Sequence, residues 1–142
     1  MEFKVYQKEL ELQSRGWIPT FHDISKEVGL MTMVCADSMA EASKITTLKP
    51  TVVVAEPSEL IGPGVSVGPE YVAAAFQCVK SVDQDVLVLT AAGISNGEDV
   101  YNTIIAGADA TGSSSGVAKA ADRPAMVEEM IAAVRRAWDA RH

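Results

Sequence analysis

The chain has 142 residues, of which 48% are hydrophobic and 22% are charged, and this composition is typical of a globular domain rather than a disordered or fibrous chain. The net charge of −7 argues against a nucleic-acid partner, because binding to a phosphate backbone depends on clustered Lys and Arg. A small phosphorylated ligand is compatible with this charge, since backbone amides can bind a phosphate.

The sequence contains no apolar run of the length that a membrane span needs, and its first residues lack a signal-peptide pattern. We therefore expect a cytoplasmic protein with no membrane partner. The two cysteines, Cys35 and Cys78, form neither a disulfide framework nor a redox pair. The two histidines, His22 and His142, show no metal-ligand spacing, so we predict no metal site.

Residues 1–28 show no clear register of strands and helices, and we interpret them as a separate N-terminal segment that ends in a helix. From Gly29 onward, short apolar runs alternate with amphipathic segments. Strands are predicted near residues 30–34, 51–55, 85–89 and, more weakly, 109–113.

A helix is predicted after each of these strands. Ser38 with Glu41, and Ser95 with Glu98, match the capping box that opens a helix. Pro69 suits the first turn of a third helix, where its missing N–H costs nothing. The last helix is predicted to start near Asp122 and to bury one apolar face, made up of Met126, Val127, Met130, Ile131, Val134 and Trp138.

The order of these elements over residues 29–142 is four βα units, which predicts an α/β fold with parallel strands. The run Val52-Val53-Val54 is β-branched throughout, as in a strand that is buried on both faces. Periodicity alone does not separate an open sheet from part of a barrel.

Glu56 follows this buried strand directly, and a loop rich in Pro and Gly comes after it. The carboxyl ends of parallel strands are where α/β folds hold their ligands, so Glu56 is a candidate catalytic carboxylate. The alternative interpretation is a glutamate that only caps a nearby helix.

The same loop resembles a motif of a known family. Residues 56–64 read Glu-Pro-Ser-Glu-Leu-Ile-Gly-Pro-Gly, which is similar to the sixth-loop lid of archaeal-type triosephosphate isomerases. Residues 92–100 resemble the seventh loop and its helix, and residues 114–120 resemble the eighth loop. Upstream, residues 29–35 resemble the fifth strand. The four matches are in register over about residues 21–142.

This resemblance implies the carboxyl-terminal half of a (β/α)8 barrel. It also implies an isomerase that interconverts dihydroxyacetone phosphate and glyceraldehyde 3-phosphate through an enediolate, without a cofactor. Glu56 matches the base that moves the proton between the two substrate carbons. The resemblance assigns the substrate phosphate to Ile61, Gly62, Gly93, Ser95, Ser114, Ser115 and Gly116.

Each of these positions also has a purely structural interpretation. Ser95 can be a helix cap, Gly93 a turn glycine, and Ser114 and Ser115 exposed loop residues. Glu59 is better interpreted as part of the lid surface than as a second catalyst. Cys35 is interpreted as a small buried residue and His22 as a helix-surface residue.

The sequence departs from the family at several points. Ala91 stands where the family has glycine, and Pro63 stands where the lid commonly has threonine. Residues 111–113 read Thr-Gly-Ser, where bulky aliphatic residues are usual, so the fourth strand should pack weakly. The first-strand Asn-x-Lys motif and the fourth-strand Asn-His-Ser-Glu-like motif are not intact; Lys4 is only a faint match to the family lysine.

Four βα units supply about half of such a barrel, and open sheet edges invite pairing with another chain. We therefore expect a homo-oligomer or association with a complementing N-terminal half. Two functions are carried forward: a partial triosephosphate isomerase with impaired activity alone, and a non-catalytic half-barrel that binds phosphate.

Overall fold

A computed structural model describes residues 25, 29–57 and 67–142. The element order is β1 (Met33–Ala36), α3 (Met39–Thr46), β2 (Val52–Ala55), α4 (Pro69–Lys80), β3 (Leu87–Leu89), α5 (Gly97–Ile105), α6 (Ser115–Ala118) and α7 (Arg123–Arg141). The predicted helix within residues 1–28 lies outside the described residues apart from Ser25, so the proposed division at residue 28 stays a prediction.

The three strands form one parallel sheet in the order β1-β2-β3, which confirms the α/β class. β2 is the central strand, and Val53 pairs with Val34 on one side and with Val88 on the other. β-branched side chains favour this extended, two-sided burial.

The helices begin where the sequence predicts, with one exception described below. Ser38 caps α3 by accepting a hydrogen bond from the Glu41 amide (3.2 Å), and the Glu41 carboxylate accepts one from the Asp37 amide (2.9 Å). Pro69 lies in the first turn of α4, and the Asp122 carboxylate caps α7 through the Ala125 amide (3.0 Å). Each cap satisfies amides that a helix start leaves without partners.

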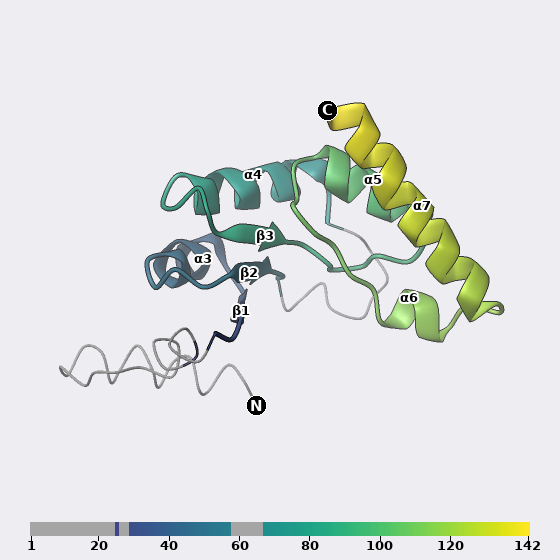
Figure 1. Cartoon of the computed structure of the whole chain (residues 1–142), viewed down its shortest axis with the longest axis horizontal. Coiled ribbons are helices and arrows are strands. Elements are labelled where there is room, and N and C mark those ends of the chain that lie inside the picture. Colours follow the sequence, from purple (N-terminus) through teal and green to yellow (C-terminus); the bar gives the residue numbers. More distant parts are fainter. Residues whose placement is uncertain (1–24, 26–28, 58–66) are drawn as a thin grey trace.

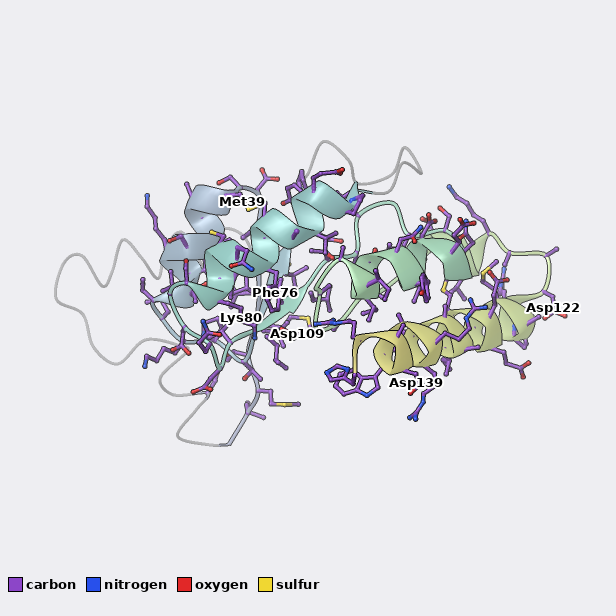
Figure 2. All side chains as sticks on the ribbon, turned by 90° about the horizontal axis from the view of Figure 1, so that it is seen from above. Met39, Phe76, Lys80, Asp109, Asp122 and Asp139 are labelled. Atoms are coloured by element: carbon purple, nitrogen blue, oxygen red, sulfur yellow. The ribbon has the colours of Figure 1, made fainter. Side chains whose placement is uncertain are left out.

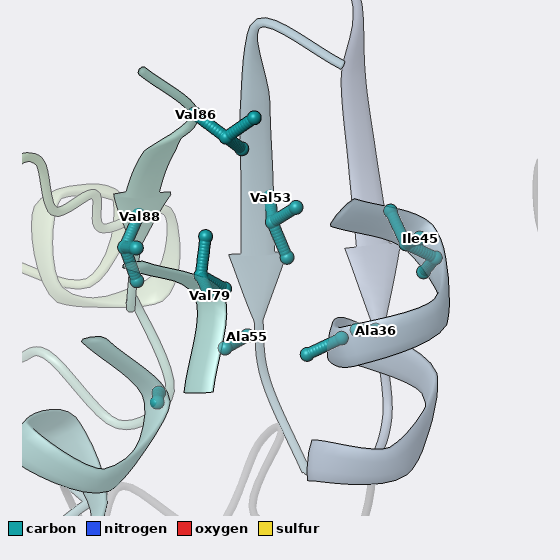
Figure 3. Close-up of a cluster of buried hydrophobic side chains, with 9 residues drawn as sticks. Ala36, Ile45, Val53, Ala55, Val79, Val86 and Val88 are labelled. Carbon is teal, nitrogen blue, oxygen red and sulfur yellow. The ribbon is translucent and has the colours of Figure 1, made fainter. Parts of the chain in front are cut away.

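The main hydrophobic core lies between the sheet and the layer formed by α3 and α4 (Figure 3). Ile45 from α3, Val79 from α4 and the strand residues Val53 and Val88 have no exposed surface. Burial of aliphatic side chains of this size contributes about 1.5–3 kcal/mol each to folding. The core therefore holds β1, β2 and β3 against two helices.

The fourth predicted strand is reduced to a single parallel bridge between Leu89 and Ala110. Gly112 and Ser113, the next residues, have low strand propensity, and Gly112 brings no side chain to the core. The segment stays in place through polar contacts instead. The Thr111 hydroxyl donates to the Thr90 carbonyl oxygen (2.8 Å), and the Asp109 and Ala110 amides donate to the Val88 carbonyl oxygen.

One ion pair joins this segment to the sheet. Lys80 Nζ on α4 lies 3.1 Å from Asp109 Oδ2, and the same oxygen accepts a hydrogen bond from the Val88 amide. Lys80 also donates to the Val86 carbonyl oxygen and lies over the Phe76 ring, 5.4 Å from its centroid (Figure 2). Only a small part of either charged side chain is exposed to solvent.

The last helix does not bury the face that its sequence pattern predicts. α7 packs along α5 through Ala133 and Ala137, which are fully buried, and the two helices lie side by side in Figures 1 and 2. Four of the residues that were predicted to be buried are instead exposed: Val127, Ile131, Val134 and Trp138. The prediction was wrong because periodicity shows an apolar stripe but not whether a partner covers it.

Candidate active site

The carboxyl ends of the strands lie at one edge of the sheet, because all three strands run in the same direction. Figure 1 shows the arrowheads of β2 and β3 pointing toward the side of the molecule where α6 lies. The loops that start at this edge are the ones that carry the predicted site residues. Parallel α/β folds bind their ligands at such an edge.

Glu56 is the first residue after β2, and its amide continues the ladder by donating to the Ala36 carbonyl oxygen (3.0 Å). The side chain is half-buried, and this burial raises the pKa of the Glu56 carboxyl above that of an ordinary glutamate. Among the helices that the structure describes, none is capped by Glu56. The geometry therefore does not support the interpretation of Glu56 as a capping residue.

Tyr71, in the first turn of α4, is near enough to Glu56 to interact with it electrostatically, and sequence reasoning did not single it out. Burial raises the pKa of the Tyr71 hydroxyl, and electrostatic interaction with Asp37 and Glu56 raises this pKa further. Tyr71 also packs against both the main core and the smaller cluster of Val67, Val72, Ala92 and Ala108. A tyrosine in an amphipathic helix looks like an ordinary core residue, so the sequence gives no signal for this position.

The loop after β3 turns at Gly93, whose φ of +77° favours glycine because other residues would be strained there. The Ser95 hydroxyl folds back and donates to the Gly93 carbonyl oxygen (3.0 Å). Both predicted site residues of this loop are half-buried. They form one tight turn directly before α5.

The helix cap at α5 differs from the predicted one. Asn96, not Ser95, is the N-cap, and its side-chain oxygen accepts from the Asp99 amide (2.9 Å). The Asp99 carboxylate in turn accepts from the Ser95 amide (2.9 Å). The capping pair is thus shifted by one residue, because asparagine caps a helix as well as serine does. The Ser95 hydroxyl is not used as a cap.

The loop after Ala110 packs directly on this turn. The Ser113 hydroxyl donates to the Ile94 carbonyl oxygen at 2.6 Å. A Cβ atom added at Gly116 would lie 2.8 Å from that carbonyl oxygen and 2.9 Å from Ser95 Cα, so only glycine fits there. Gly93, Ser95 and Gly116 are therefore brought together, while Ser114 and Ser115 are exposed at the start of α6.

Two positions that depart from the family are neighbours in this region. A Cβ atom added at Gly112 would meet the Ala91 side chain at 3.8 Å, an ordinary van der Waals contact, so Ala91 does not exclude a side chain at position 112.

The lid residues Glu59, Ile61, Gly62 and Pro63 lie outside the described residues, as does His22. The described residues on either side of the lid are placed by the sheet and the next loop. Glu56 and Pro57 follow β2, and the Val67 amide donates to the Ala92 carbonyl oxygen (3.3 Å). Of the described residues that flank this segment, Pro57 follows the candidate base and Val67 lies against the loop that contains Gly93.

Within residues 25, 29–57 and 67–142, no three His, Cys, Asp or Glu side chains are grouped so that they could hold a metal ion. In the same part of the chain, no helix combines the length and apolar character that crossing a bilayer requires. The site chemistry that can be described is that of one carboxylate with a raised pKa and two loops that present amides and hydroxyls.

Comparisons with known proteins place this geometry in a family. The triosephosphate isomerase of Methanocaldococcus jannaschii is 38% identical over 109 residues, which cover 75% of this chain and 50% of the relative. The triosephosphate isomerases of Metallosphaera sedula (36% identical, 82% of this chain, 52% of the relative) and Sulfurisphaera tokodaii (38% identical, 80% and 51%) give the same result. The chain thus spans about half the length of the curated relatives it matches. No family model matches it.

A solved structure supports the fold alone. A chain in the crystal structure of the Amycolatopsis orientalis BexX/CysO complex superimposes with a TM-score of 0.63 at 16% identity, covering 82% of this chain and 46% of that chain.

The parallel sheet, its helices and its strand-end loops define the class of protein: an α/β chain that corresponds to half of a (β/α)8 barrel. The curated relatives then give the family. The chain is a homologue of the archaeal triosephosphate isomerases and matches them over about half of their length.

Proposed function

We propose that this chain carries the catalytic base and part of the phosphate site of a triosephosphate isomerase. The reaction is the interconversion of dihydroxyacetone phosphate and glyceraldehyde 3-phosphate, and it needs no cofactor. The relatives at 36–38% identity carry this activity in their names. The observation that best supports the proposal is a half-buried glutamate at the end of the central strand, followed by the lid sequence of the family.

Glu56 is proposed as the base. Its carboxylate removes a proton from one substrate carbon, an enediolate forms, and the protonated carboxyl returns the proton to the neighbouring carbon. No group is consumed, because the same carboxyl accepts and donates the proton. A raised pKa makes Glu56 a stronger base than an exposed glutamate, and general bases work best when their pKa approaches the working pH.

The phosphate site is proposed at the junction of three loops. Ile61 and Gly62 belong to the lid, Gly93 and Ser95 to the turn before α5, and Ser114, Ser115 and Gly116 to the start of α6. The contact of Gly116 with Ser95 supports this grouping, since it joins two of the loops. One amide is already used, because the Ser95 N–H donates to Asp99; a phosphate oxygen at that amide would displace a carboxylate.

The partner of this half-barrel is proposed to be either another copy of the chain or a complementing N-terminal half, and the location is proposed to be the cytoplasm. Stabilisation of the enediolate needs electrophilic groups, which commonly contribute on the order of 100-fold or more each. The family lysine and histidine motifs are not intact in this sequence. Activity of the chain alone is therefore expected to be low.

The second candidate function is a half-barrel that binds phosphate without catalysis. The missing lysine and histidine motifs favour it, because the loops for binding would remain while the electrophiles are absent. The two functions make the same prediction for phosphate binding and opposite predictions for turnover.

An isomerase assay with dihydroxyacetone phosphate, run beside a calorimetric titration with the same compound, separates the two functions. The Glu56→Gln variant should turn over about 100- to 10,000-fold more slowly. It should still bind dihydroxyacetone phosphate, since only the base is removed. Glu128→Gln on the exposed side of α7 is the matched control and should change neither measurement. Turnover that survives Glu56→Gln contradicts the assignment of the base. Binding without turnover in the unaltered chain supports the second function, and absence of binding contradicts both.

A further inference from the structure

α7 contacts both ends of α5, and each contact joins a charged side chain to backbone groups. At the start of α5, the Glu129 carboxylate accepts a hydrogen bond from the Gly97 amide (2.7 Å). At the other end, Arg141 Nη1 donates to the carbonyl oxygens of Ile104 (2.9 Å) and Ala108 (3.0 Å). The two helices therefore run in the same direction, and they lie side by side in Figure 2. Each end of α5 meets a charge of the sign that the helix dipole favours.

The start of α5 leaves room for Glu129 because position 97 is a glycine. Gly97 is buried, and a Cβ atom added there would lie 2.8 Å from Glu129 Cγ, 2.9 Å from Glu129 Oε1 and 3.2 Å from the Glu129 carbonyl oxygen. Any side chain at position 97 would therefore push the carboxylate away from the amide. Glu129 supplies a hydrogen-bond partner to a buried amide, which is costly to leave without one.

The turn directly before α5, which carries predicted phosphate-binding residues, is attached to the same helix start. The Ser95 amide donates to the Asp99 carboxylate in the first turn of α5 (2.9 Å). Ile94 is buried in one cluster with Val100 of α5 and Ala133 of α7. The turn is thus supported by both helices. A shift of the start of α5 relative to α7 would move the Ser95 amide with it.

From these contacts we propose that Glu129 is a positioning residue for the phosphate site: it holds the start of α5, and with it the Ser95 amide, in the place where a phosphate oxygen binds. This inference rests on the proposed function, in which that turn binds the substrate phosphate. Asp99 and Glu129 then have different roles, although both accept amides at one helix start. A phosphate oxygen displaces Asp99 from the Ser95 amide, whereas Glu129 stays on the Gly97 amide and keeps the helix start in place.

Charge and position predict opposite effects for the removal of the Glu129 side chain. Its carboxylate is a negative charge on an amide two residues from Ser95, so charge alone predicts that phosphate binds more tightly without it. Position predicts weaker binding, because the Ser95 amide is held less firmly. The rest of the Glu129 side chain is exposed, so its removal leaves no cavity that could account for weaker binding.

Calorimetric titration of the full chain with dihydroxyacetone phosphate, and separately with inorganic phosphate, tests the proposal. Glu129→Ala should weaken binding about fivefold or more, the loss that accompanies one misplaced hydrogen-bond donor. Glu129→Gln keeps an acceptor oxygen for the Gly97 amide without the charge, and it should bind at least as tightly as the unaltered chain. Arg141→Met is the matched control: it breaks the contact between the same two helices at the end away from the turn, and it should leave binding within about twofold.

Gly97→Ala displaces the same carboxylate without changing any charge. Its Cβ atom would press on Glu129 Cγ and Oε1, so the hydrogen bond to the amide should be lost. Binding of phosphate should weaken in the same direction as in Glu129→Ala. In the Glu129→Ala background the same substitution should add less, because the side chain that it presses against is absent. An effect of charge alone predicts instead no change in Gly97→Ala.

A second measurement reads the position of the turn without any ligand. Amide hydrogen exchange, followed by nuclear magnetic resonance, reports how firmly the Ser95 amide is held by Asp99. Glu129→Ala should speed the exchange of the Ser95 amide about fivefold or more relative to that of the Val88 amide in β3. Arg141→Met should leave this ratio unchanged.

Three results of the titrations overturn the proposal: Glu129→Ala binds phosphate as tightly as the unaltered chain or more tightly, Glu129→Gln loses as much affinity as Glu129→Ala, or Arg141→Met loses as much. Absence of phosphate binding in the unaltered chain contradicts the proposed function, and the exchange of the Ser95 amide then decides the role of Glu129. Faster exchange in Glu129→Ala supports Glu129 as the residue that holds the turn, and an unchanged rate overturns that role as well.

Discussion

The sheet region and the α5–α7 region of this chain are built differently, although the helices of both carry apolar residues at helical spacing. In the sheet region, α3 and α4 lie on three paired strands; Ile45 and Val79 are fully buried there, and Met39 and Phe76 are partly buried. In the α5–α7 region, α7 lies on another helix through Ala133 and Ala137, and four of its larger apolar residues are exposed to solvent. Helical spacing thus shows which face of a helix is apolar. Whether that face is buried depends on the elements that pack against it.

The largest expected contrast comes from one substitution made in both regions. Ile45→Ala on α3 should cost about 2–5 kcal/mol of the free energy of unfolding, because it leaves a cavity at a fully buried position. Ile131→Ala on α7, whose residue is 64% exposed, should change it by less than about 0.5 kcal/mol. Urea denaturation of the dilute protein measures both. Equal costs at the two positions would show that Ile131 is buried in the folded chain.

Substitution of Gly116 tests whether the stability of the loop region depends on close backbone contact rather than on side-chain burial. Gly116→Ala should cost about 1–3 kcal/mol, because its Cβ would press against the Ile94 carbonyl oxygen and Ser95 Cα. Weaker binding of dihydroxyacetone phosphate should accompany this loss. Gly112→Ala is the control, since its Cβ would meet Ala91 at an ordinary distance and should cost little. Equal tolerance at both glycines would mean that the two loops are not packed together.

Asp99 separates helix capping from phosphate binding in the same region. Asp99→Ala and Asp122→Ala each remove a carboxylate that accepts a backbone amide at a helix start, and each should cost roughly 0.5–2 kcal/mol. Only Asp99→Ala frees the Ser95 amide and removes a negative charge beside it, so only this variant should bind phosphate more tightly. Calorimetric titration with inorganic phosphate measures the difference. A loss of binding in Asp99→Ala would place the phosphate elsewhere.

The smallest expected effect concerns Glu56, at the end of β2 in the sheet region. Its raised pKa means that the folded chain holds this proton more tightly than the unfolded chain does. Stability from this group is therefore present at acid pH and is lost as the pH rises through the folded pKa. Glu56→Gln should melt at a slightly higher temperature than the unaltered chain at neutral pH, and the difference should vanish in acid. A variant that is less stable at neutral pH would show that the ionised carboxylate has a favourable partner.

The sequence alone predicted the helix starts and the strand that depend on residues close together in the chain. Ser38 with Glu41, Pro69 and Asp122 begin helices where their chemistry predicts, and the β-branched run at Val53 forms the central strand. The position of Glu56 at the end of that strand follows from the same local pattern. These features depend on residues within one or two turns of each other.

The features that were missed depend on residues far apart in the chain. The contact of Ser113 with Ile94 joins residues 19 positions apart. The one-residue shift of the α5 cap is the local exception, because Ser95 and Asn96 are both good capping residues and the sequence does not decide between them. The exposure of Ile131 depends on which elements pack against α7, and helical spacing carries no information about that. The catalytic and phosphate-binding roles themselves come from the family resemblance and remain predictions.

The ion pair between Lys80 and Asp109 has a consequence for the order in which the chain opens. It joins α4 of the sheet region to the segment that leads into α6 and α7, and the same Asp109 oxygen also holds the Val88 amide of β3. Proteins open in cooperative units, and a unit with little buried apolar surface opens first. Amide hydrogens of α5 and α7 should therefore exchange before those of β2, with the Val88 amide marking the point where the two units meet.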